Sequence, residues 1–179
     1  FSPDAKYLAS CGADRFMKIF EVATGAFLRS FEGHTHHVLG VSWRADGRQL
    51  ATCGADNAIK VWNFLTGAQV KSIGGFGKEV TSIQYVAIGD LVLVGAGDNK
   101  VSTKNTTGDG GSDFGGATDF VYCARSSADG KVFVAGGHDS VVRVWKEGGE
   151  TIVNFEPPAD DTSASIPPDG AGQVVGGGQ

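Results

Sequence analysis

The sequence contains little proline, no paired cysteine motif and no long apolar run. Only five of its 179 residues are proline, and four of these lie between residues 157 and 168. Its three cysteines are widely spaced and include no CxxC pair. That pattern argues against a disulfide framework and against a structural zinc site. No apolar stretch approaches the roughly 18 residues that a membrane-spanning helix needs.

An excess of positive charge is also lacking. The chain carries 15 basic and 20 acidic residues, a formal net charge of -5. Nucleic-acid binders generally show a basic excess or a basic stripe, because phosphate neutralisation supplies much of their affinity. The first residues, FSPDAKYLAS, do not resemble a secretory signal. We therefore expect a protein that binds neither nucleic acid nor membrane and that resides in a reducing compartment such as the cytoplasm.

Glycine is abundant, at 28 residues, roughly twice the usual frequency of about 7%. So many glycines among β-branched residues suggest many short strands joined by tight turns. The sequence also contains an internal repeat, since LASCGADRFMKIFEVATG at residues 8–25 closely matches LATCGADNAIKVWNFLTG at residues 50–67. Weaker copies follow at residues 93–108 and 133–149. The repeat is marked by four aspartates at intervals of 42, 42 and 41 residues, namely Asp14, Asp56, Asp98 and Asp139. A repeat of this length indicates an architecture of stacked units.

Each repeat unit has the pattern of short strands and not of helices. In the best unit, alternating or short apolar runs at residues 38–43, 48–53, 58–62 and 68–73 are separated by turns rich in Gly, Asp and Asn. Equivalent first strands are expected at residues 80–85 and 120–124. Each unit is thus predicted to be a four-stranded antiparallel meander, which must stack on its neighbours to bury its faces.

A period of 41 to 42 residues with four strands per unit is typical of β-propeller blades. The residues that carry this pattern are Gly33-His34 before the first strand, the ASCGAD and ATCGAD segments, and the KVW and RVW strand ends. In these features the sequence resembles the WD40 repeat family over most of residues 1–155. The resemblance implies an all-β fold of four-stranded blades, arranged as a partial or open ring.

The resemblance also implies a hydrogen-bonded set in each blade that joins a His, a Ser or Thr, the turn Asp and a Trp. One blade carries the full set, at His34, Thr52, Asp56 and Trp62. The other blades keep partial sets, in which Lys104 replaces the third Trp: Ser10, Asp14 and Phe20; Asp98; Asp139 and Trp145. Because these residues recur with the repeat, we interpret them as structural and not as catalytic.

The expected organisation is a partial blade at residues 1–31, blades at 34–74 and 118–155, and a degenerate blade at 78–116. Residues 156–179 are expected to form a polar connector and the start of a fifth unit, because IPPDGAGQVVGGGQ aligns with the beginning of the chain. Complete rings of this family usually have seven or eight blades. We therefore expect end blades with exposed apolar faces, completed by further blades of a longer chain or by a second copy.

Several motifs contain residue types found in metal or catalytic sites but lack the arrangement that such sites require. His36 and His37 lie beside His34, yet no Cys or second His cluster completes a metal site. Three consecutive turn residues, His138, Asp139 and Ser140, cannot adopt the geometry of a hydrolase triad. The glycine-rich run at residues 108–116 is expected to be an eroded, loose and exposed outer strand. Cys11 and Cys53 are expected to be small apolar residues between blades.

The sequence favours a noncatalytic scaffold that holds partner proteins or peptides on its loops, with no metal or cofactor. The alternative is a propeller module attached to an enzymatic or redox domain outside this chain, such as a c-type haem domain. A CxxCH motif in a longer reading frame would favour the alternative.

Overall fold

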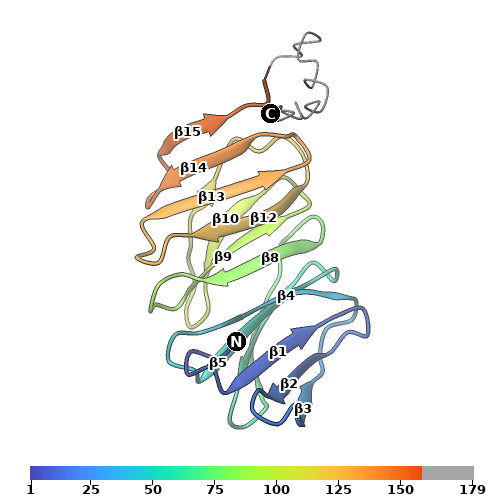
Figure 1. Ribbon diagram of the computed structural model, residues 1–179. Coiled ribbons are helices and arrows are strands. Elements are labelled where there is room, and N and C mark those ends of the chain that lie inside the picture. The colour runs from blue at the N-terminus through green and yellow to red at the C-terminus, as the bar shows by residue number, and fades with distance from the viewer. Residues whose placement is uncertain (159–179) are drawn as a thin grey trace, which may run out of the picture.

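The computed structural model describes residues 1–158 and consists of four antiparallel sheets with short connections (Figure 1). Within each sheet the strands lie in chain order. The first sheet holds β1 (Tyr7–Cys11), β2 (Met17–Glu21) and β3 (Phe27–Phe31). The second holds β4 (Val38–Trp43), β5 (Gln49–Gly54), β6 (Ile59–Asn63) and β7 (Gln69–Ile73). The third holds β8 (Val80–Tyr85), β9 (Leu91–Ala96), β10 (Val101–Asn105) and β11 (Asp113–Phe114). The fourth holds β12 (Val121–Ser126), β13 (Val132–Gly137), β14 (Val142–Lys146) and β15 (Thr151–Phe155).

The all-β prediction and the meander within each unit are therefore confirmed. Two predicted first strands match β4 and β8, whereas the third, β12, begins one residue later than expected and extends to Ser126. Residues 156–158 of the predicted connector lie outside any strand. The rest of that connector and the predicted fifth unit fall outside the described residues. No helix in residues 1–158 has the length and apolar character to cross a membrane.

Tight turns join the first two strands of the second, third and fourth sheets, and an equivalent turn precedes β1 in the first sheet. Ser2 Oγ donates to Asp4 in the first sheet (2.7 Å), and Ser127 Oγ donates to Asp129 in the fourth (2.6 Å). Each serine oxygen in turn accepts the N–H of the residue five positions later. Short polar residues therefore fix the start of β1 and of β13, as is usual for Asp- and Ser-containing turns.

Apolar residues from adjacent sheets form a cluster at each of the three junctions. The first joins Met17, Ile19 and Phe31 to Leu50 and Trp62; the second joins Ala51, Cys53 and Ile59 to Val80, Ile83 and Val94; the third joins Leu93, Val101 and Phe114 to Phe133, Ala135 and Trp145. Burial of apolar surface at about 25 cal/mol per Å² makes these junctions the main source of stability. The position of Cys53 agrees with the expected small apolar residue between blades.

Hydrogen bonds between first strands reinforce the second and third junctions. Ser42 Oγ of β4 accepts the Tyr85 N–H of β8 (2.9 Å). One repeat later, Gln84 Oε1 of β8 accepts the Ser126 N–H of β12 (2.9 Å). Equivalent positions thus make equivalent links at these two junctions.

The four sheets follow one another in chain order from β1 to β15 and close no ring (Figure 1). The consequence is clear at one repeat position. Met17, Ile59 and Val101 are at most 1% exposed, because the next sheet covers them, whereas the equivalent Val142 is 42% exposed. The outer face of the fourth sheet is thus apolar and uncovered by the described residues.

The outer strand expected at residues 108–116 is short, Asp113–Phe114, and most of this segment is exposed as predicted, but it is not loose, because one side chain anchors it. Phe114 is 3% exposed, and its ring contacts Phe133 (5.0 Å between ring centroids) and Trp145 (5.7 Å) of the fourth sheet. The backbone also pairs with β10, since the Thr103 N–H donates to Ser112 O (2.8 Å). A side chain at Gly111 would collide with the Thr103 carbonyl. The glycines therefore permit a close approach and do not indicate a lost strand.

Two ends of the sheets present the connections. We call one the turn face, which carries residues 44–48, 86–90 and 127–131 between first and second strands and the equivalent residues 2–6 before β1. The opposite end, the loop face, carries residues 12–16, 54–58, 97–100 and 138–141, and the segments that lead from one sheet to the next. Any partner that binds at a sheet junction meets one of these two faces.

Candidate functional site

The structure brings together the four residues of the complete set. His34 Nδ1 lies 2.9 Å from both carboxylate oxygens of Asp56, and His34 Nε2 lies 2.8 Å from Thr52 Oγ1. Trp62 Nε1 donates to Thr52 Oγ1 (2.8 Å). His34, Thr52 and Trp62 are buried at the junction between the first and second sheets.

The contacts determine which atoms carry protons. Indole Nε1–H can only donate, so Thr52 Oγ1 accepts from Trp62 and is free to donate its own proton to His34 Nε2. His34 is then neutral, with its proton on Nδ1 and directed at Asp56. Burial lowers the pKa of His34, against the opposing effect of Asp56. Burial opposes ionisation of Asp56, but the contacts with His34 and the Thr35 N–H outweigh it and lower the pKa of Asp56.

Glycine at position 54 makes the contact between His34 and Asp56 possible. A Cβ at this position would lie 2.8 Å from His34 Nδ1 and 2.9 Å from the Asp56 carboxylate. Such distances are too short for any side chain to be accommodated without movement. The GAD sequence of this repeat thus has a steric reason in addition to its turn chemistry.

The turn aspartates of the second, third and fourth sheets share one backbone contact. Asp56 Oδ2 accepts the N–H of Thr35 (3.0 Å), Asp98 Oδ2 that of Gly77 (2.7 Å), and Asp139 Oδ2 that of Thr118 (3.0 Å). Each contact ties the turn between the second and third strands to the segment that enters the same sheet. The carboxylate thereby satisfies a backbone donor and fixes the loop face.

Asp139 in the fourth sheet has a cationic partner that the sequence analysis missed. Arg143 Nη1 donates to Asp139 Oδ2 (2.7 Å), and both side chains are less than 10% exposed. Burial would raise the pKa of Asp139, but the N–H groups of Thr118 and Val141 and the Arg143 guanidinium lower it to about 2. The ion pair could have been predicted from two features of the sequence: an arginine lies four residues after the aspartate, and Ala117 occupies the position of the histidine.

The partial sets in the first and third sheets make fewer contacts. Asp14 pairs with Lys18 at the surface, and Ser10 is exposed. Phe20 packs edge to face on Phe27 (5.8 Å), not on a histidine. Asp98 Oδ1 is buried without a hydrogen-bond partner among the described residues. The structure therefore does not bring these residues into a hydrogen-bonded set like that of the second sheet.

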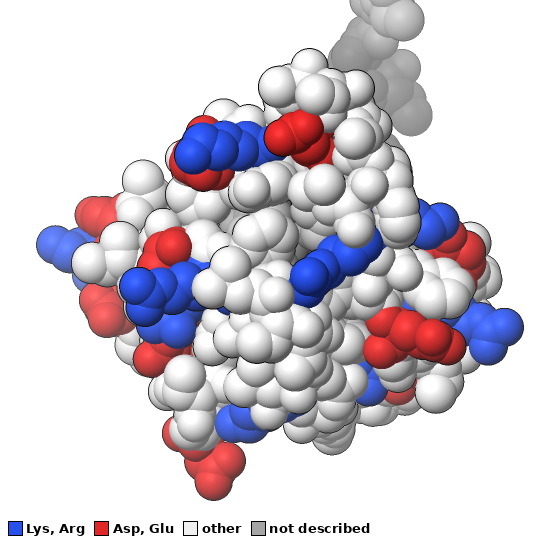
Figure 2. Space-filling model, turned by 90° about the horizontal axis from the view of Figure 1, so that it is seen from below, with Lys and Arg blue, Asp and Glu red and all other residues white. Residues whose placement is uncertain are grey.

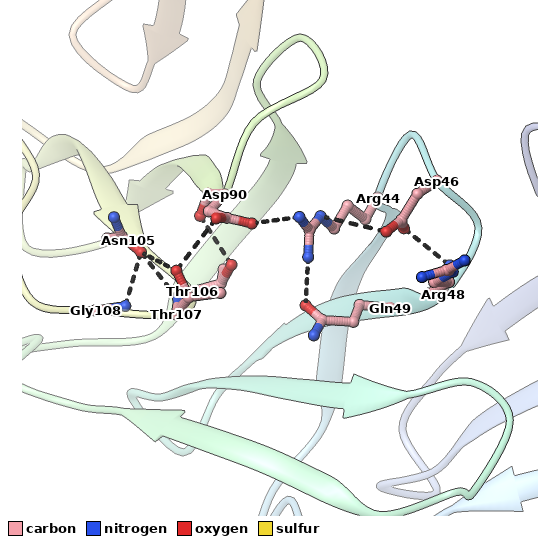
Figure 3. Close-up of polar contacts among 9 residues, drawn as sticks. All are labelled: Arg44, Asp46, Arg48, Gln49, Asp90, Asn105, Thr106, Thr107 and Gly108. Atoms are coloured by element: carbon pink, nitrogen blue, oxygen red, sulfur yellow. Dashed lines mark hydrogen bonds and ion pairs between the residues drawn. The ribbon is translucent and has the colours of Figure 1, made fainter.

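A polar cluster on the turn face joins the second and third sheets (Figure 3). Arg44 lies between two carboxylates, 2.7 Å from Asp90 through Nη2 and 3.8 Å from Asp46 through Nε. Thr106 Oγ1 donates to Asp90 O (2.8 Å), and Thr107 Oγ1 donates to Asp90 Oδ2 (3.2 Å). Asp90 occupies the position at which the other units have Lys6, Arg48 and Lys131. This reversal of charge is the feature of the sequence from which the polar cluster could have been predicted.

Two pockets lie at the junction of the first and second sheets, one on each face. The pocket on the turn face has a volume of about 240 Å³ and aromatic lining from Tyr7, Trp43 and Phe64, with Leu65 at its edge. Phe64 contacts both other rings, each at 5.0 Å between centroids. The pocket on the loop face has a volume of about 350 Å³. Both are open to a partner, and neither was expected from the sequence.

The groups that suggested metal or thiol chemistry are placed as follows. The rings of His36 and His37 lie 4.4 Å apart on the loop face, away from the buried His34. Within residues 1–158, no group of three or more His, Cys, Asp or Glu side chains is arranged to hold a metal ion. All three cysteines are free thiols, and burial raises the pKa of Cys11 and Cys53.

Comparison with known proteins agrees with this geometry. The sequence matches the family model of the WD domain, G-beta repeat (WD40), at residues 1–21, 25–63 and 111–146, which together make up more than half of the chain. The unmatched residues 64–110 include β8, β9 and β10 of the third sheet, in which Lys104 replaces the Trp. A comparison with curated proteins found no match. The chain belongs to the WD40 repeat family.

Proposed function

We propose that this protein is a noncatalytic scaffold that binds partner polypeptides on the exposed ends of its sheets. WD40 repeat domains generally serve as protein-interaction scaffolds and are typically noncatalytic. The turn aspartates of this chain support the same role. Asp56, Asp98 and Asp139 each accept a backbone N–H and so stabilise the loops that would face a partner.

The aromatic pocket on the turn face is the observation that carries the proposal. Phe64 packs on both Tyr7 and Trp43, the other two rings that line the pocket, and Leu65 at its edge is 71% exposed. An aromatic pocket with an exposed leucine at its edge, surrounded by polar residues such as Asp46 and Arg48, is typical of the anchor positions of a protein interface. Ile88, on the same face in the next sheet, is 86% exposed and extends the apolar surface available to a partner.

The distribution of charge favours a polypeptide over a nucleic acid. On the face shown in Figure 2, Lys and Arg alternate with Asp and Glu and are separated by uncharged surface. Phosphate backbones are bound by fields of one sign. We further propose a reducing compartment, on the support of the three free thiols.

Site-specific photocrosslinking in the native host tests the proposal. A photoreactive residue at Leu65 or His36 should give a discrete protein adduct, because both positions border an open pocket. The control is Val22, an exposed residue that lines neither pocket. Adducts of equal yield at all three positions, or no protein adduct at Leu65 and His36, would contradict a scaffold that uses these faces.

A further inference from the structure

The pocket on the loop face crosses a boundary between sheets. It is lined by Ala13 and Arg15 of the turn between β1 and β2 and by residues 35–37, which lead into β4. The two segments are held together by the Val38 N–H, which donates to Gly12 O (3.0 Å). The lining is therefore brought together by two sheets and does not belong to a single flexible loop.

The charged and polar groups of this pocket are suited to an anion. Arg15 is permanently charged, His36 and His37 present nitrogen atoms beside it, and no carboxylate lines the pocket. Two acidic residues next to the pocket are already paired. Asp14 contacts Lys18, and Asp56 is hydrogen-bonded to His34.

Arg15 itself has no ion-pair partner among residues 1–158. The pocket therefore holds uncompensated positive charge on a chain whose net charge is -5. An oxyanion of a ligand would supply the missing counter-charge.

The turn itself does not explain why an arginine stands at position 15. Arg15 has φ of 72°, in the left-handed region that asparagine tolerates well and most other residues do not. The equivalent turn residues in the other sheets are Asn57, Asn99 and Ser140, with φ of 60°, 66° and 60°. An arginine in this conformation, with its side chain exposed at a pocket, indicates a role for the guanidinium outside the turn.

We propose that this pocket binds one oxyanion, a phosphoryl or carboxylate group, carried by a peptide segment of a partner protein. The Arg15 guanidinium pairs with two oxygens of the group, since its planar fork fits a carboxylate or phosphate. His36 and His37 add donors from the second sheet. This inference rests on the proposed scaffold function and names the chemistry that the loop face recognises.

Peptide binding to the full chain tests the inference. The probes are three fluorescent nonapeptide pools with random flanks and a central phosphoserine, glutamate or serine, and the readout is anisotropy at near-physiological salt. We expect at least one anionic pool to bind about tenfold more tightly than the serine pool. Binding of the phosphoserine pool alone identifies a phosphoryl site, and binding of both anionic pools identifies a general oxyanion site.

Two matched variants assign the binding to the pocket. Arg15→Asn should reduce anionic binding to the level of the serine pool, while thermal unfolding stays equal to or above the wild type, because asparagine suits the turn. Lys131→Asn also removes one positive charge, from an exposed position on the turn face that lines neither pocket, and should leave binding unchanged. Equal binding of all pools, or equal losses in both variants, would overturn the inference. If either of these outcomes were found while Leu65 still gave protein adducts, the anion site would be refuted and the scaffold function would remain supported.

Discussion

The second and fourth sheets hold equivalent aspartates in different ways. Asp56 is bonded to a neutral imidazole within a chain that continues through Thr52 to Trp62. Asp139 is bonded to the Arg143 guanidinium in a buried ion pair. Both aspartates nevertheless accept the N–H of the residue that leads into their own sheet.

This comparison shows that the turn aspartate keeps its backbone contact in both sheets, whereas its side-chain partner differs. The contact between carboxylate and backbone is present in both sheets, so the loop geometry depends on it. The partner on the other side of the carboxylate varies with the space available. Ala117 and Ala135 are small where the second sheet has His34 and Thr52, and they leave room for the Arg143 side chain, which lines the same space beside Trp145. A network of neutral groups and an ion pair should therefore respond differently to substitution and to pH.

The largest expected effect is the loss of the buried cation in the fourth sheet. Arg143→Ala leaves the Asp139 carboxylate, 8% exposed, without its counter-charge. Breaking a buried ion pair from one side costs about 3–5 kcal/mol of unfolding free energy. Urea titration measures this loss. The matched control is Lys60→Ala, at the same repeat position in the second sheet, where His34 is the partner of Asp56. Equal losses in the two variants would contradict the difference between the sheets.

An intermediate effect is expected for the turn aspartates. Asp56→Ala leaves the His34 Nδ1–H and the Thr35 N–H without an acceptor, at a cost of about 1–3 kcal/mol for an unsatisfied buried group. Asp98→Ala should cost less, because the Gly77 N–H is the only backbone donor that Asp98 accepts in the described structure, and its Oδ1 has no partner. Parallel denaturant titrations give both values. An equal or larger loss for Asp98→Ala would show that the histidine contact contributes nothing.

The repeat made much of the fold predictable from the sequence. Local alternation of apolar residues places β4 and β8 within the expected bounds, because a strand with one buried face must have that period. The grouping of His34, Thr52, Asp56 and Trp62 followed from resemblance to the WD40 family, and their contribution to stability stays a prediction.

Contacts across sheet boundaries were not predictable in the same way. Phe114 lies in a glycine-rich segment, and its burial depends on Phe133 and Trp145 of the following sheet. The ion pair of Arg44 with Asp90 joins turns that are 46 residues apart in the chain. Neither contact leaves a periodic pattern. Each is visible in the sequence only as a departure from the other repeats, and a single departure does not identify its partner.

The two sheets should also differ in their response to pH. The pKa of His34 lies below its ordinary value, so the network around it is fully stabilising above about pH 6.5 and loses stability as the pH falls below that value. The slope is at most about 1.4 kcal/mol per pH unit for one proton. The pKa of Asp139 is about 2, so its contribution persists until the pH falls below about 4. Unfolding free energies of wild type and His34→Ala between pH 7 and pH 5 should converge as the pH falls. Parallel curves would show that His34 does not titrate with folding.

The smallest effect is expected in the first sheet, where the aspartate of the repeat is exposed. Asp14 pairs with Lys18, and their side chains are 47% and 40% exposed. Asp14→Asn keeps an oxygen for the Phe16 N–H and removes only an ion pair that water and salt already screen. The unfolding free energy at near-physiological salt should therefore match the wild type within error. Asp139→Asn makes the same chemical change at a buried site and should destabilise strongly, because Arg143 loses its counter-charge. Equal losses of unfolding free energy in the two variants would show that burial of the aspartate does not cause the difference between the sheets. The difference would then have to be explained by turn geometry alone.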